Sequence, residues 1–168
     1  MEKEYIVRRL LMKFWVKVIL CVVVVNLLGG AGALITSSKI PTWYAFLEKP
    51  PGVPPNWIFG PVWTALYTMI GISIARYWHL VQSGAEKNQG WIWMVTQMVL
   101  NLAWTPIFFG ANWLGVALIV IVGMIVTIAG TIRKFRPQEK IAAFLLVPYL
   151  TWVCYATYRN AGYWWLNR

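Results

Sequence analysis

Five long apolar stretches divide this sequence, and each is close to the roughly 20 residues that a helix needs to cross a membrane. The bilayer core offers no partner to an unpaired backbone group, so these stretches are predicted to be helices. The alternating pattern of a membrane β-barrel is absent from the sequence. We therefore expect an all-α, polytopic membrane protein, with a single domain (1–168) forming a five-transmembrane-helix bundle. The predicted spans are residues 14–35, 61–80, 91–109, 113–132 and 141–158.

Composition excludes an ordinary soluble domain. Hydrophobic residues make up 60% of the chain and charged residues 12%, whereas a soluble domain is about half apolar and about a quarter charged. The net charge is +10, but the basic residues lie between apolar stretches rather than in a patch on a soluble fold, so no nucleic-acid partner is expected. Cys21 and Cys154 lack the spacing of metal ligands, so no metal site is predicted.

Basic residues predict the orientation of the bundle. An odd number of spans places the termini on opposite sides, and most Lys and Arg residues fall on the side of the N-terminus. The positive-inside rule then predicts a cytoplasmic N-terminus, with the C-terminus and the first loop on the outer side. One alternative is a cleavable signal ending at the sequence Ala-Gly-Ala of residues 31–33. The first apolar stretch is longer than a usual signal core, which favours a retained helix.

The loop between the first two spans, residues 36–60, is predicted to be a structured lid. It is rich in proline, which stiffens the backbone. It also carries aromatic side chains that need an apolar surface to pack against. These aromatic residues are Trp43, Tyr44, Phe46, Trp57 and Phe59.

Aromatic residues recur at helical spacing on one face of three predicted spans. These faces carry Trp63 and Tyr67 in the second span, Asn101, Trp104 and Phe108 in the third, and Tyr149, Trp152 and Ala156 in the fifth. Packing or an interfacial aromatic belt explains any one face alone. However, Asn101 lies well inside its span, where a polar amide needs a partner, and all three faces lie toward the lid. We therefore expect a pocket for a planar hydrophobic ligand, such as a tetrapyrrole, a sterol or a flat heteroaromatic compound.

The predicted spans contain almost no side chains that could serve in acid–base catalysis. No Asp or Glu lies in any of them, and the only His, His79, is at the end of the second span away from the lid. Intramembrane ionisable residues mark proton relays and ion pathways. An ion-coupled transporter or a hydrolytic enzyme is therefore disfavoured.

Several motifs resemble those of the translocator protein family (TspO/MBR), which includes the bacterial tryptophan-rich sensory proteins and the mitochondrial peripheral benzodiazepine receptor. Residues 43–51 (WYAFLEKPP) and 54–64 (PPNWIFGPVWT) are similar to its first loop and the start of its second helix. Residues 101–110 (NLAWTPIFFG) resemble its third-helix motif, and residues 148–152 (PYLTW) resemble its fifth-helix motif. The resemblance covers nearly the whole chain, with the motifs in the right order.

The resemblance implies a membrane protein, often a homodimer, that binds porphyrins such as protoporphyrin IX or haem, and also sterols and isoquinoline-type drugs. It implies that Trp63 and Asn101 contact polar atoms of the ligand, and that Tyr67, Trp104, Trp152 and Ala156 line the cavity. The expected function is tetrapyrrole sensing, transport or disposal, with no cofactor required. Two alternatives stay open. One is a porphyrin-degrading enzyme that uses light and oxygen, with catalytic roles for Trp63 and Trp152. The other is a sterol- or lipid-binding protein or a scaffold.

One departure concerns the cholesterol motif that animal members carry late in the fifth helix. Here the aligned residues 159–162 read Arg-Asn-Ala-Gly, and Trp165 stands at the later basic position, which argues against sterol binding. Arg159, about one helical turn beyond Ala156, is instead hypothesised to meet a porphyrin propionate. The complete predicted ligand-binding set is Trp43, Tyr44, Trp57, Trp63, Tyr67, Asn101, Trp104, Phe108, Tyr149, Trp152, Ala156 and Arg159.

Overall fold

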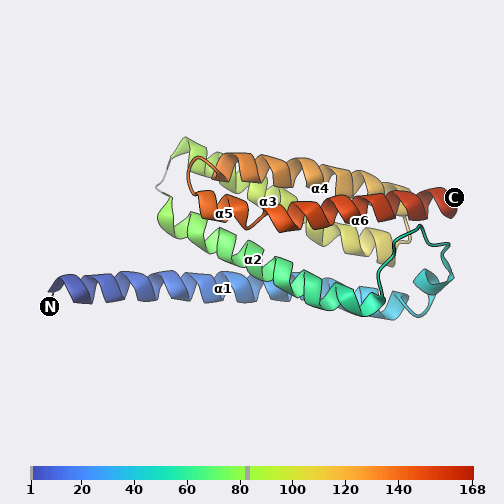
Figure 1. Ribbon diagram of the computed structural model, residues 1–168, viewed down its shortest axis with the longest axis horizontal. Helices are drawn as coiled ribbons and strands as arrows, with labels where there is room; N and C mark the ends of the chain where they lie inside the picture. The colour runs from blue at the N-terminus through green and yellow to red at the C-terminus, as the bar shows by residue number, and fades with distance from the viewer. Residues whose placement is uncertain (1, 82–83) are drawn as a thin grey trace.

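The structure is a computed structural model that describes residues 2–81 and 84–168, with side chains from residue 13 onward. The described residues form a bundle of antiparallel helices (Figure 1). Its helices are α1 (Glu2–Lys39), α2 (Phe59–Leu80), α3 (Ala85–Thr105), α4 (Leu114–Phe135), α5 (Lys140–Phe144) and α6 (Val147–Leu166). Five segments are long and apolar enough to span a membrane: Lys13–Lys39, Asn56–Leu80, Ala85–Gly110, Leu114–Phe135 and Lys140–Leu166. The predicted five-helix membrane bundle is confirmed.

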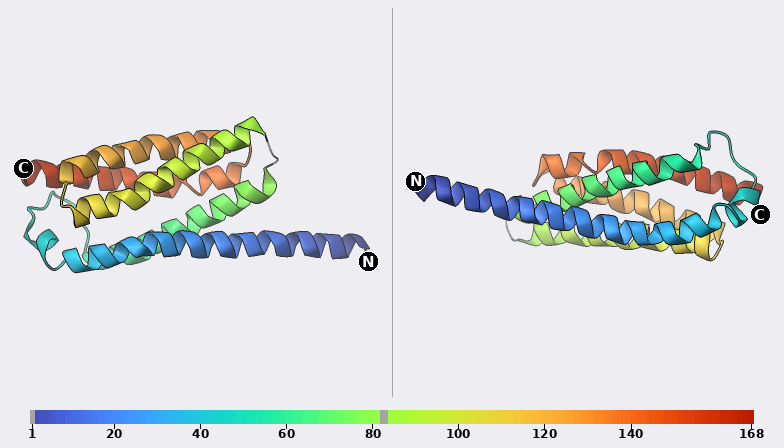
Figure 2. Two further views of the ribbon diagram at one scale, coloured as in Figure 1. Left: turned by 180° about the vertical axis from the view of Figure 1, so that it is seen from behind. Right: turned by 90° about the horizontal axis from the view of Figure 1, so that it is seen from below.

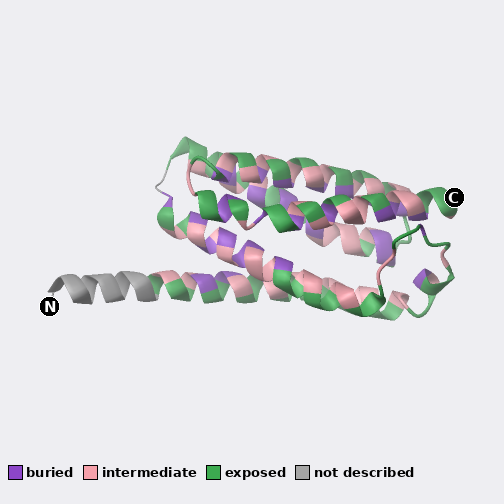
Figure 3. Cartoon of the chain, in the orientation of Figure 1, coloured by how far each residue is buried: buried purple, intermediate pink, exposed green. Residues whose placement is uncertain are grey.

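Neighbouring helices pack in two main groups. Helix α1 packs mainly on α2, and α4 packs against both α3 and α6. The two chain ends lie at opposite ends of the bundle, and the loop after α1 lies at the same end as the C-terminus (Figures 1 and 2). Buried residues occupy the inward faces of the helices, while much of the outer surface is exposed (Figure 3). The outer faces carry large apolar side chains such as Leu27 and Ile119, as a surface in contact with lipid requires.

The fifth span is broken near its start and extends further than expected. Helix α5 ends at Phe144 and α6 begins at Val147, with Pro148 in its first turn. The proline ring clashes with the carbonyl group four residues earlier, that of Phe144, and it has no N–H to donate, so the helix is interrupted there. Helix α6 then continues past the predicted end at residue 158 to Leu166.

The third span ends in a wide helical turn that changes which side chains face inward. In this π-helical turn, Pro106–Gly110, the Ala111 N–H donates to the Pro106 carbonyl five residues earlier at 2.8 Å. Asn112 then takes a left-handed conformation with φ 61°, which asparagine tolerates better than most residues. Because a π-turn adds one residue to the helical repeat, the adjacent Phe108 and Phe109 are both buried.

An ion pair ties α2 to the start of α5 at the end of the bundle away from the loop. Arg76 Nε donates to Glu139 Oε2 at 2.7 Å, and Glu139 caps α5 by accepting from the N–H groups of Ile141 and Ala142. Burial by itself raises the pKa of Glu139, but the Arg76 guanidinium and these N–H groups outweigh it, so the pKa is lowered overall. A carboxylate with a lowered pKa in the folded protein stabilises the fold above its unfolded-state pKa.

The unfolding free energy should therefore depend on pH through the ionisation of Glu139. Glu139→Gln is expected to lose about 1 kcal/mol of unfolding free energy at pH 7, the usual size of a capping contribution. The loss should shrink as the pH falls below about 4.3, the ordinary pKa of glutamate, and through the lower folded-state value. Thermal unfolding in detergent from pH 7 to pH 3 measures this difference. Glu48→Gln, which leaves the pair with Arg76 intact, is the control, and an equal loss at every pH would contradict the assignment.

Candidate functional site

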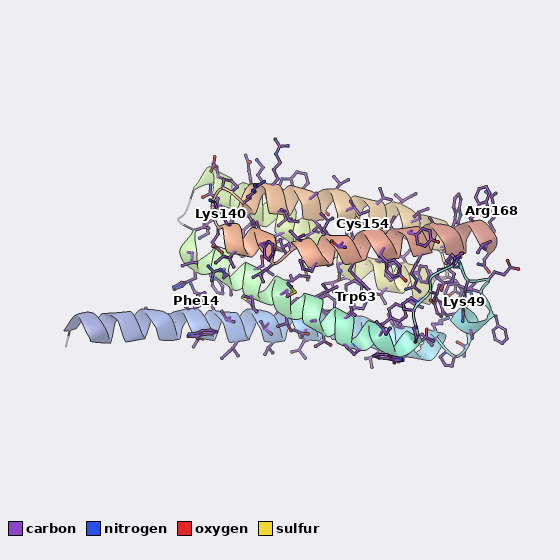
Figure 4. All side chains as sticks on the ribbon, in the orientation of Figure 1. Phe14, Lys49, Trp63, Lys140, Cys154 and Arg168 are labelled. Atoms are coloured by element: carbon purple, nitrogen blue, oxygen red, sulfur yellow. The ribbon has the colours of Figure 1, made fainter. Side chains whose placement is uncertain are left out.

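A cavity of about 340 Å³ lies among α1, α2, α3, α4 and α6 at the loop end of the bundle. This volume falls within the range of about 300–1,000 Å³ that is usual for small-molecule sites. Figure 4 marks the loop end of the bundle by Lys49 and Arg168 and the opposite end by Phe14 and Lys140. Most predicted site residues line the cavity: Tyr44, Trp63, Tyr67, Asn101, Trp104, Phe108, Trp152, Ala156 and Arg159.

Three residues of the predicted set do not line the cavity. Trp57 is 73% exposed, because it projects outward from the short 3-10 turn Asn56–Ile58 while its neighbour Asn56 lines the cavity. Trp43 lies behind the wall, with its ring centroid 5.8 Å from that of Phe108. Tyr149 is completely buried and supports the wall through its hydroxyl group.

A hydrogen-bonded chain of three side chains crosses the floor of the site. The Tyr67 hydroxyl donates to Asn101 Oδ1 at 3.1 Å, and Asn101 Nδ2 donates to the Tyr149 hydroxyl at 2.8 Å. An amide has two N–H donors and two acceptor lone pairs, so Asn101 keeps one of each for a ligand. The Trp63 ring stacks on Tyr67 at 5.2 Å. The network thus holds both the amide and the indole in fixed positions.

The indole N–H groups of Trp104 and Trp63 differ in their hydrogen bonding. Trp104 Nε1 donates to Asn160 Oδ1 at 3.0 Å, and Asn160 in turn donates to the Leu114 carbonyl at 2.9 Å. Trp104 therefore offers only its ring face. In the described part of the chain, the structure shows no hydrogen bond from the Trp63 indole, which leaves its N–H available to a ligand. Sequence reasoning missed Asn160, because the fifth span was predicted to end at residue 158 and the structure continues that helix to Leu166.

Helix α1 forms a wall that the sequence did not predict as part of the site. It contributes Asn26, Gly29, Gly30, Gly32, Ala33, Thr36 and Ser37. At Gly29, a side-chain Cβ would lie 2.1 Å from Cε2 of Tyr67, so glycine leaves the space that the Tyr67 ring occupies. The run of small residues was the available signal, but small residues also allow plain helix packing.

The loop between α1 and α2 is structured, as predicted, and its residues Ile40, Tyr44 and Asn56 line the end of the cavity; we call this loop the lid. Tyr44 is buried, and its hydroxyl shares a 2.5 Å hydrogen bond with that of Tyr163 in α6. The Tyr155 hydroxyl donates to the carbonyl of Gly52, which turns the lid with a φ of 78° that favours glycine. A Cβ at Gly162 would lie 2.5 Å from Cβ of Pro50. Glycine therefore allows the lid to rest on α6.

Tyr44 remains protonated over the physiological pH range. Burial, together with the hydrogen bond to Tyr163, raises the pKa of Tyr44 well above its ordinary value, although the Arg159 guanidinium acts in the opposite direction. Since the hydroxyl groups of Tyr44 and Tyr163 share one hydrogen bond, one O–H of the pair remains to be donated within the cavity. Arg159 Nη2 donates to the Tyr44 hydroxyl at 2.6 Å.

The chemistry of the cavity is that of binding by burial and stacking. Its described lining residues include no carboxylate, imidazole or thiol. Within residues 13–81 and 84–168, no group of three or more His, Cys, Asp or Glu side chains could hold a metal ion. The walls are flat aromatic rings, with a few amide, hydroxyl and guanidinium groups to orient a ligand.

Comparisons with known proteins agree with the motifs. A profile of the TspO/MBR family matches residues 19–166. The chain is 37% identical to the tryptophan-rich protein TspO of Chlorobaculum tepidum, over 84% of this chain and 89% of that protein. It is 35% identical to the tryptophan-rich sensory protein of Cereibacter sphaeroides, over 79% and 84% of the two chains. It is 38% identical to the human translocator protein, over 73% of each chain. The chain is therefore an integral, multi-pass membrane protein that belongs to the TspO/MBR family.

Proposed function

We propose that this protein binds porphyrins such as protoporphyrin IX or haem in the lidded cavity, for the sensing, transport or disposal of tetrapyrroles. The observation that carries the proposal is the composition of the cavity wall. Trp63, Trp104 and Trp152 line one space together with Asn101, and flat, rigid aromatic walls with a few polar groups suit a planar apolar ligand. Family membership supports the same class of ligand.

The side of the membrane and the assembly form part of the proposal. The excess of Lys and Arg at the N-terminal side supports a cytoplasmic N-terminus, with the lid and the C-terminus on the outer side. The resemblance to the family supports a homodimer. Membrane lipid surrounds the apolar outer faces of the helices.

Titration of the purified protein with protoporphyrin IX tests the proposal. We expect saturable quenching of tryptophan fluorescence at micromolar ligand. Trp152→Ala should weaken binding about 10-fold, because one large aromatic contact contributes about 1–1.5 kcal/mol. Trp113→Ala is the matched control, since Trp113 is 62% exposed and lies outside the cavity lining. Quenching that rises linearly without saturation would contradict the proposal.

The same titration under illumination addresses the second candidate, a light- and oxygen-dependent porphyrin-degrading enzyme. Its support is that Trp63 and Trp152, the proposed redox partners, line the same cavity. Porphyrin absorbance is followed in the light with and without protein. A loss that depends on both indoles indicates the enzyme, and a loss equal to that of free porphyrin leaves a binding protein.

A further inference from the structure

A buried positive charge lies in the wall of the cavity beneath the lid. Arg159 of α6 is 7% exposed and lines the cavity. The described lining residues include no Asp, Glu, Lys or His, so the guanidinium sets the charge of the site. Arginine is rarely buried unless it is paired with a group of opposite charge.

Among the residues with described side chains, none neutralises this charge. Arg159 Nη2 donates to the hydroxyl groups of Tyr44 at 2.6 Å and Tyr163 at 3.4 Å, and the guanidinium lies 4.8 Å from the ring centroid of Phe59. All these partners are uncharged. Nε is buried and has no hydrogen-bond partner. In the described part of the chain, the ion pair found joins Arg76 to Glu139 and does not involve Arg159.

Burying an unpaired charge costs free energy, because the charge loses its hydration. A carboxylate held in a charge-assisted hydrogen bond best compensates for this cost. The planar guanidinium matches the two oxygen atoms of a carboxylate. The hydroxyl groups of Tyr44 and Tyr163 share one hydrogen bond, so one O–H of this pair is left as a further donor beside the guanidinium. The surrounding cavity is mostly aromatic, so the complementary ligand is a flat apolar molecule with a carboxylate at one edge.

We propose that Arg159 is an anion subsite that makes the cavity selective for planar apolar ligands bearing a carboxylate, which it holds beneath the lid. This rests on the proposed function, and it adds a preference and an orientation that the aromatic walls alone do not provide. The acidic edge of the ligand faces Arg159 and Tyr44. Its apolar body lies among the tryptophan rings, within reach of Asn101.

A pair of ligands that differ only in the acid group tests the subsite. Protoporphyrin IX and its dimethyl ester share the same macrocycle, and the ester has no carboxylate. In dim light, tryptophan quenching by the wild-type protein should give binding of the acid about 10- to 100-fold tighter than that of the ester, the range expected for a charge-assisted hydrogen bond. Arg159→Gln should remove this preference by weakening the acid alone, and Arg159→Lys should retain part of it.

Arg133→Gln is the matched control, because Arg133 is an exposed cation near the opposite end of α4, outside the cavity. Equal binding of acid and ester by the wild-type protein would overturn the subsite while leaving porphyrin binding intact. Equal weakening of both ligands in Arg159→Gln would also overturn it, because it would show that Arg159 only holds the lid. Saturable quenching by neither ligand would refute the proposed function itself. If Arg159→Gln fails to fold, the wild-type comparison of the two ligands decides.

Discussion

Asn101→Leu is expected to lower the unfolding free energy by about 1–3 kcal/mol and to weaken porphyrin binding about 10-fold. Asn101 is 4% exposed and joins Tyr67 of α2 to Tyr149 of α6 from its place on α3. Leucine fills a similar volume but leaves both tyrosine hydroxyls without this partner. A hydrogen bond between membrane helices contributes about 0.6 kcal/mol on average and up to about 1.7, and two are lost here.

Thermal unfolding in detergent and the porphyrin titration measure the two effects. Thr96→Val, on the exposed face of the same helix, should change stability by less than about 0.5 kcal/mol. Adding Tyr149→Phe to Asn101→Leu should recover part of the stability, because it removes one of the two unpaired hydroxyls. If the single variant unfolds like the wild type, the network does not hold the three helices together.

Gly71→Ala should lower the unfolding free energy by about 1–3 kcal/mol, the usual result of forcing extra volume into a packed contact. Gly71 of α2 lies directly against α1, and a Cβ there would be 2.6 Å from Cα and 2.8 Å from N of Val22. These are backbone atoms, so no rotamer change relieves the clash and the two helices must separate. Helix α1 forms one wall of the cavity, and binding should weaken together with stability.

Gly30→Ala is the control for the intrinsic preference of alanine for a helix. A Cβ at Gly30 would meet nothing within 4 Å, so this substitution should be neutral or stabilise by up to about 1 kcal/mol. The contrast between the two variants, measured by thermal unfolding, isolates the clash. Equal stability of the two would show that α1 and α2 are not packed as closely as the structure indicates.

Helical periodicity identified the wall residues of the second, third and fifth spans, and Trp63, Trp104 and Trp152 all line one cavity. Periodicity was less informative where the backbone is irregular. Trp57 lies in a short 3-10 turn and faces outward. Phe109, outside the predicted set, lines the cavity beside Phe108 because a π-helical turn changes the spacing.

Contacts between segments that are distant in the sequence explain the other differences between the predicted and the observed site. Tyr149 has the spacing of a wall residue, yet it is covered by its own partners and acts through Asn101. In the sequence, the glycine-rich part of α1 indicates only close helix packing. It forms a wall of the cavity because α1 lies beside α2 in the folded structure. The sequence placed Arg159 only along its helix, about one turn beyond Ala156. The structure shows that Arg159 is buried beneath the lid. There it donates a hydrogen bond to the hydroxyl of Tyr44, which lies 115 positions away in the sequence.

The sequence by itself determined the number and approximate positions of the membrane helices, the structured loop between the first two and the family, because a bilayer demands long apolar helices and because the motifs are local. Only the tertiary structure decided which helices share the cavity, which polar groups remain free inside it, and that a guanidinium is buried there against uncharged described partners. These properties depend on contacts between distant segments. Whether a side chain is buried or paired follows from its neighbours in space, which no local pattern specifies.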